Sequence, residues 1–113
     1  MAANAALVRF KEKQVEQQSR LIVQIQATIA DFKLLGGSLD FQIRAEEDRI
    51  KNRDPSHFAY PTLAKATIQR RNNLLQSIDK LKIQLDAAKK ALREETEELD
   101  AIARLADLAI VHS

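Results

Sequence analysis

The chain has 113 residues, of which 30% are charged and 4% are aromatic, and it contains no Cys and no Trp. So few aromatic residues argue against a large globular core, and the abundance of good helix formers favours long helices over a sheet. The absence of Cys excludes disulfides, thiolate metal sites and cysteine nucleophiles. The net charge of +2 is too small to indicate nucleic-acid binding.

Neither a secretory leader nor a membrane span is recognisable in the sequence. The first residues lack the apolar stretch of a signal peptide. No segment approaches the roughly 18 consecutive apolar residues that cross a bilayer. We therefore expect a soluble, cytoplasmic protein.

Apolar residues in the first half recur at alternating intervals of three and four, which is the pattern of a coiled coil whose a and d positions face a partner helix. Nine of the 13 predicted a and d positions hold large apolar residues. The thirteen are Val8, Lys11, Val15, Gln18, Ile22, Ile25, Ile29, Phe32, Gly36, Leu39, Ile43, Glu46 and Ile50. This pattern predicts one helical arm over about residues 4–52.

A connection and a second arm follow. Both prolines lie in residues 53–61, and each disfavours helix at the residue before it. We predict that Asp54 caps a turn starting at Pro55, and that Pro61 starts a second arm over about residues 62–110. Twelve of the 15 a and d positions in this half are apolar. The fifteen positions are Tyr60, Ala64, Thr67, Arg71, Leu74, Ile78, Leu81, Leu85, Ala88, Leu92, Glu95, Leu99, Ile102, Ala106 and Ala109.

Two long arms and a short connection predict an all-α fold, a single antiparallel two-helix coiled-coil hairpin over residues 1–113. Pairing the arms about the connection sets Ile50 opposite Ala64 and Ile22 opposite Leu92. The same register predicts four further sets of neighbours, namely Gly36 with Ile78, Gln18 with Glu95, Glu46 with Thr67 and Arg71, and Lys13 with Glu97 and Asp100.

The glycine pair in the first arm allows a second interpretation. Each Gly in a helix interior costs about 1 kcal/mol relative to Ala. The first helix would then end at Gly36-Gly37, with Ser38 capping a new helix, and a compact three-helix bundle would result. Because the heptad continues in phase from Phe32 to Leu39, we favour one continuous helix with a bend at the glycines.

No pattern of residues indicates catalysis. The two histidines, His57 and His112, lack the convergent partners that a metal site needs. The pair Gly36-Gly37 lacks the Lys and the preceding strand of a phosphate-binding loop. We therefore expect no enzyme activity, no catalytic residue, no cofactor and no metal.

Two groups of residues are candidates for binding a protein partner. Leu34 and Phe41 lie one heptad apart on the predicted outer face of the first arm, where they either are scattered surface residues or meet another copy or a different protein. Other apolar residues outside the predicted seam are Phe10, Val23 and Ile83. Near the connection, Phe58, Tyr60, Arg70 and Arg71 combine aromatic and Arg side chains, as interface hot spots do. Alternatively, Tyr60 only closes the end of the seam.

Two segments resemble flagellar type III export proteins of the FliJ type, in their alphaproteobacterial form. The first is Asp54–Ala66 (DPSHFAYPTLAKA), followed by Arg70, Arg71, Asn73 and Leu74. The second is Leu7–Lys11 with Gln14 and Val15. The similarity extends over most of the chain, and its distinctive part is about 20 residues long.

This resemblance implies a small cytoplasmic antiparallel coiled coil without enzyme activity. It implies three kinds of protein partner: the hexameric flagellar export ATPase, whose ring would hold the chain as a stalk, the cytoplasmic domain of the export gate, and export chaperones. Such a protein is peripheral to the membrane only through these partners and is monomeric in isolation. Two alternatives are a self-assembling structural coiled coil and a basic helical hairpin that binds RNA, although the aromatics are too few for a base-stacking platform.

Overall fold

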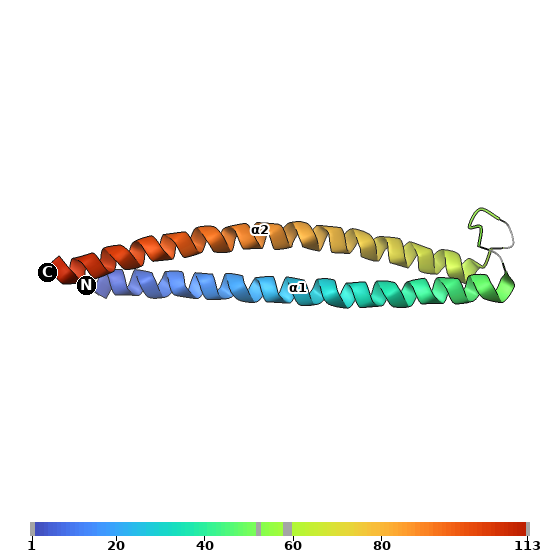
Figure 1. Ribbon diagram of the computed structural model, residues 1–113, viewed down its shortest axis with the longest axis horizontal. Helices are drawn as coiled ribbons and strands as arrows, with labels where there is room; N and C mark the ends of the chain where they lie inside the picture. The colour runs from blue at the N-terminus through green and yellow to red at the C-terminus, as the bar shows by residue number, and fades with distance from the viewer. Residues whose placement is uncertain (1, 52, 58–59, 113) are drawn as a thin grey trace. The chain divides into compact units, whose positions relative to one another are not determined.

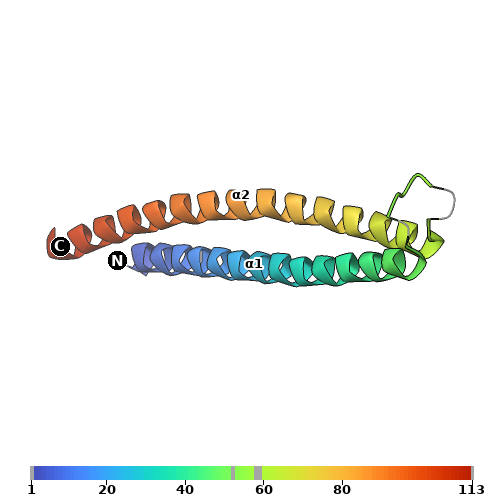
Figure 2. The ribbon, with the colours of Figure 1, turned by 45° about the vertical axis from the view of Figure 1, so that its right-hand side comes forward.

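A computed structural model describes residues 2–51, 53–57 and 60–112 of the chain. Within them lie two helices, α1 (Ala2–Ile50) and α2 (Thr62–His112), and no strand (Figure 1). The contacts group the chain into unit 1, made of Met1–Gln26 and Ile83–Ser113, and unit 2, made of Ala27–Lys82. In each unit a stretch of α1 lies beside a stretch of α2 that runs in the opposite direction (Figures 1 and 2). The predicted all-α antiparallel hairpin is therefore confirmed.

Helix α1 continues through its glycine pair. Residues Gly36, Gly37 and Ser38 lie inside α1, and neither glycine has a positive φ. Gly36 is buried against α2, where an added Cβ would lie 3.7 Å from Leu74 Cδ2. The three-helix interpretation is therefore wrong, because the seam that continues on both sides of the glycines holds the helix together across them.

The predicted seam is the buried face of both helices. All 13 predicted positions of α1 and all 15 predicted positions from Tyr60 onward are buried or partly buried. In unit 1 the most buried apolar residues are Ile22, Ile25 and Ala88. In unit 2 they are Ile29, Gly36, Leu39, Ile43, Tyr60, Ala64 and Ile78. This strict spacing is why both helices form: each alone is too polar to fold, and pairing buries its apolar stripe.

The predicted register, however, is wrong by about one helical turn. Gly36 faces Leu74 rather than Ile78, and these two α2 residues are one turn apart. The prediction paired a positions with a positions. When two helices run in opposite directions, the order of a and d along the axis is reversed in one of them, so an a residue shares its layer with a d residue. Gly36 is an a position and Leu74 is a d position.

The polar pairs shift with the register. In unit 1, Gln18 Nε2 donates to the Ala88 carbonyl oxygen at 3.3 Å, instead of facing Glu95. Among the described residues, no ion pair joins Lys13 to Glu97 or Asp100, and the pair found in this region joins Lys11 Nζ to Glu98 Oε2 at 2.7 Å.

In unit 2, Glu46 and Thr67 line the same depression, as their predicted proximity implies, whereas the ion pairs of Glu46 and Arg71 are formed with other residues. Glu46 pairs with Arg49 on its own helix at 2.9 Å. Arg71 pairs with Asp40 at 3.1 Å. Thr67 is buried, and its hydroxyl donates to the Leu63 carbonyl oxygen one turn earlier at 2.9 Å. The polar side chains at a and d positions of unit 2 therefore bond either to their own helix, as Glu46 and Thr67 do, or to a residue beside the seam on the other helix, as Arg71 does.

The connection in unit 2 is built from short local hydrogen bonds. Lys51, just after α1, adopts the left-handed conformation with φ of 54°, and its N–H donates to the Asp48 carbonyl oxygen at 3.3 Å. Asp54 Oδ1 accepts bonds from the Ser56 N–H at 3.0 Å and hydroxyl at 2.7 Å, so Asp54 caps a turn as predicted. These two bonds hold the pKa of Asp54 below its ordinary value. The Pro61 carbonyl oxygen accepts the first bond of α2, from the Lys65 N–H.

Candidate functional site

The outer face of α1 in unit 2 exposes two large apolar side chains. Leu34 is 76% exposed and Phe41 is 75% exposed. Both occupy f positions, which point away from the seam, so their predicted exposure is confirmed. The other apolar residues predicted to lie outside the seam are exposed as well, namely Phe10, Val23 and Ile83. Binding of a partner by these residues stays a prediction.

Leu34 and Phe41 belong to a longer stripe of exposed residues on α1 that the heptad prediction did not identify. Between and before them, exposed small residues recur at intervals of three and four. The set comprises Ala27, Ala30, Leu34, Gly37 and Phe41, which we name the outer stripe. The sequence also indicates this stripe, because its members alternate between the b and f positions of the same heptad, at intervals of three and four residues. Small residues let a second helix approach the backbone closely, so this face is suited to contact with a helix.

Tyr60 lies at the end of the seam in unit 2 rather than on the surface. Its side chain is 4% exposed, and its hydroxyl donates to Glu47 Oε2 at 3.0 Å. The pKa of Tyr60 is raised above 10.0, mainly because the side chain is buried. The hydrogen bond to Glu47 and the negative charge of Glu47 raise this pKa further, whereas the positive charge of Arg71 lowers it. Tyr60 thus closes the seam, the second of its two predicted roles. Phe58 lies outside the described residues.

The neighbouring arginines of α2 have different environments. Arg71 is partly buried at an a position, where it pairs with Asp40. Its Nε is buried and has no hydrogen-bond partner among the described parts of the chain. Arg70 is exposed, and no ion pair to it is found within residues 2–51, 53–57 and 60–112. Of the two, Arg70 exposes its charge to solvent, and Arg71 packs beside the seam, so binding of a partner by either residue stays a prediction.

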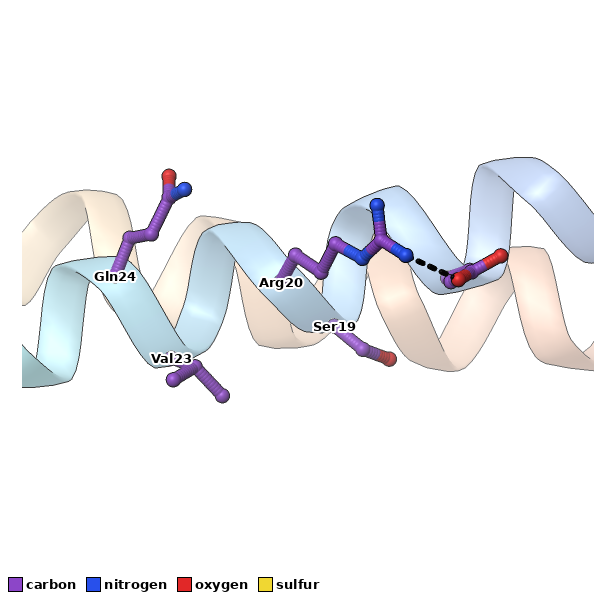
Figure 3. Close-up of a pocket in the computed structure, with 5 residues that line it drawn as sticks. Ser19, Arg20, Val23 and Gln24 are labelled. Carbon is purple, nitrogen blue, oxygen red and sulfur yellow. Dashed lines mark hydrogen bonds and ion pairs between the residues drawn. The ribbon is translucent and has the colours of Figure 1, made fainter.

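A shallow depression lies on α1 in unit 1 (Figure 3). Ser19, Arg20, Val23 and Gln24 come from the same helix and diverge from one another, and Arg20 pairs with Glu16. No group in it converges on a common point, as the polar groups of a small-molecule site do. Among the described residues there is also no cluster of three or more His, Asp or Glu side chains that could hold a metal ion.

The described parts of the helices contain no stretch that is both long and apolar enough to cross a bilayer.

Comparison with known proteins adds no relative. No protein-family model, no curated protein and no solved structure matches the chain.

Proposed function

We propose that this chain is a non-catalytic, protein-binding helical hairpin. The observation that carries this proposal is the outer stripe, where Leu34 and Phe41 expose about three quarters of their side chains. Water-exposed large apolar groups in a repeating pattern are typical of surfaces that a partner covers. In the depression of unit 1 the polar side chains diverge rather than converge on one point, which favours protein binding over catalysis there.

Within this class, we propose a component of the flagellar type III export apparatus. The resemblance of the segment around the connection to FliJ-type proteins supports this assignment, and the two-helix fold is compatible with it. The proposed partners are the hexameric export ATPase, the cytoplasmic domain of the export gate and export chaperones. In this role the protein works in the cytoplasm and reaches the membrane only through these partners. It hydrolyses nothing itself.

Binding to a purified hexameric flagellar export ATPase tests this proposal. The native chain is titrated into the ATPase by isothermal calorimetry, beside a double variant, Leu34→Ser with Phe41→Ser. We expect saturable binding of the native chain and at least about a tenfold loss of affinity in the variant, which is about 1.4 kcal/mol. Ile83→Ser is the matched control, because Ile83 is 70% exposed outside the outer stripe.

Two results would contradict the proposal in different ways. Absence of binding to the ATPase, to the gate domain and to export chaperones would remove the flagellar assignment. Equal binding by the native chain and the double variant would remove the outer stripe from the interface. In that case Arg70→Ala is the next variant. Tyr60→Ala is unsuitable, because Tyr60 is 4% exposed and its truncation would damage the seam.

Self-assembly is the second candidate, and the small residues of the outer stripe favour it specifically. Ala27, Ala30 and Gly37 would allow two identical stripes to approach closely, with Leu34 and Phe41 packed between them. Sedimentation equilibrium over a concentration series distinguishes the two functions. A dimer that the Leu34→Ser, Phe41→Ser variant abolishes would support self-assembly, whereas a monomer throughout would exclude it.

A further inference from the structure

The two sides of α1 that border the seam in unit 2 differ in their charge. On one side of the seam, the adjoining positions of α1 are all charged: Lys33, Asp40 and Glu47. On the other side only one of the corresponding positions is charged, and the set is Thr28, Leu35, Gln42 and Arg49. Two-stranded coiled coils usually carry charged residues on both sides of the seam. On the less charged side, Leu35 widens the apolar stripe of α1, as side chains do in bundles of more than two helices.

Two open depressions lie on this less charged side. The first is lined by apolar residues from both helices together with polar residues of α2: Phe32, Leu35, Leu39, Leu74, Arg70, Asn73 and Ser77. The second lies nearer the connection and is lined by Phe41, Gln42, Ala45, Glu46, Leu63 and Thr67. We name the two together the third-helix groove. Leu35 is 49% exposed and Leu63 is 59% exposed, so apolar surface remains uncovered in both depressions.

Within the described chain, the groove carries one positive charge that no ion pair neutralises. Arg70 lines the first depression, is exposed and has no ion pair among the residues that the structure describes. The other arginines near it are compensated, because Arg71 pairs with Asp40 and Arg49 pairs with Glu46. Unit 2 as a whole contains ten Lys and Arg residues against seven Asp and Glu residues. A ligand with negative charge beside Arg70 would complement this surface.

We propose that the third-helix groove binds an amphipathic α-helix of a partner protein, with apolar residues facing Leu35, Leu63 and Leu74 and acidic residues facing Arg70. A groove between two antiparallel helices has the shape that a third helix fills, and such helices insert side chains spaced at three and four residues. The groove is distinct from the outer stripe apart from Phe41, which lies at the border of both. The inference holds whether or not the chain binds an export ATPase.

A second copy of this chain is a poorer occupant of the groove. Symmetric contact between two grooves would bring two units with excess positive charge together. Each copy would also place its exposed Arg70 on the same shared face. Like charges across an interface weaken association. An acidic helix removes this repulsion and supplies the missing partner of Arg70.

Fluorescence anisotropy with designed peptides tests the proposal on the full chain. The probe is a labelled helical peptide of about three heptads, with Leu at a and d positions and Glu at e and g positions. The matched probe carries Lys in place of every Glu. We expect the acidic peptide to bind at least about tenfold more tightly than the basic one. Leu35→Ser should weaken binding by a similar factor, and its fold is checked by circular dichroism.

Charge reversal in the groove gives the sharpest comparison. Arg70→Glu should reduce affinity for the acidic peptide by at least about tenfold and raise affinity for the basic peptide. Lys65→Glu makes the same charge change in unit 2 outside the groove lining, so it should change both affinities much less.

Three results would overturn the proposal. The first is that neither peptide binds. The second is that Arg70→Glu and Lys65→Glu have equal effects, since binding would then reflect only the net charge of unit 2. The third is a dimer in sedimentation equilibrium that Leu35→Ser dissociates, because a second copy would then occupy the groove.

Discussion

Replacing the two glycines of α1 by alanine should stabilise the protein, and by different amounts at the two positions. A Gly-to-Ala change inside a helix contributes about 1 kcal/mol through helix propensity. At Gly37, an added Cβ would meet no atom within 4 Å beyond its own stretch of helix, so only this propensity gain applies. At Gly36, the new methyl group would lie 3.7 Å from Leu74 Cδ2, which is ordinary van der Waals contact in the buried seam. Burial of that methyl group adds up to about 0.8 kcal/mol.

We therefore expect Gly36→Ala to raise the free energy of unfolding by up to about 1.8 kcal/mol and Gly37→Ala by about 1 kcal/mol. The two side chains point to different surroundings, so the double variant should show nearly the sum. Urea denaturation followed by circular dichroism at 222 nm measures the change. The midpoint should rise while the slope of free energy against denaturant stays constant, because the buried area changes little.

Each failure of this prediction has a separate meaning. Destabilisation by Gly36→Ala together with stabilisation by Gly37→Ala would show that α1 and α2 approach too closely for a methyl group, and would refute the packing argument. Destabilisation by both changes would refute a continuous helix across the pair, because alanine would then oppose the native backbone conformation.

Three further predictions concern the end of the seam near the connection. Burial raises the pKa of the Tyr60 hydroxyl, so the native state keeps a proton that the unfolded state loses above the ordinary pKa of 10.0. The free energy of unfolding of the native chain, relative to that of Tyr60→Phe, should therefore be constant below pH 10 and fall above it. Urea denaturation over an alkaline series measures this difference. Lys51→Gly should raise the unfolding free energy by about 0.5–1 kcal/mol, because Lys51 holds a left-handed φ of 54° that glycine adopts without strain; an unchanged melting curve would contradict this. Arg71→Met should leave the free energy of unfolding unchanged or raise it slightly, despite the loss of the ion pair with Asp40, because the Nε of Arg71 is buried without a partner in the described chain. A decrease of more than about 1 kcal/mol in thermal or urea unfolding would show that the ion pair dominates.

The sequence predicted the secondary structure and the seam because both depend on local spacing. Every predicted a and d position is at least partly buried, including the polar ones such as Gln18 and Glu95. The register depends instead on how two helices meet, and a pairing of like positions gave an error of one turn at Gly36 and Leu74. Local spacing cannot detect such an error, because the same a and d positions are buried in either register.

Prediction of the candidate site was limited for a related reason. Exposure of Leu34 and Phe41 followed directly from their f positions. The role of Tyr60 stayed open in the sequence, because an aromatic residue at the end of a seam can either cap it or face a partner. Its bond to Glu47 and its burial place it in the seam. The third-helix groove was not foreseen, since it becomes visible only when the facing residues of both helices, such as Leu35 and Ser77, are known.

Engineered disulfides test the pairing of α1 with α2 in unit 2, on which both the seam and the third-helix groove depend. The native chain has no Cys, so each double variant contains a single pair of thiols. In Gly36→Cys with Leu74→Cys, the two residues share a layer, and we expect rapid disulfide formation in a glutathione buffer, measured by thiol titration. In Gly36→Cys with Ile78→Cys, the second cysteine lies one turn away, and oxidation should be much slower in the folded protein and comparable to the first variant in denaturant. Faster oxidation of the Ile78 pair would contradict the pairing of Gly36 with Leu74.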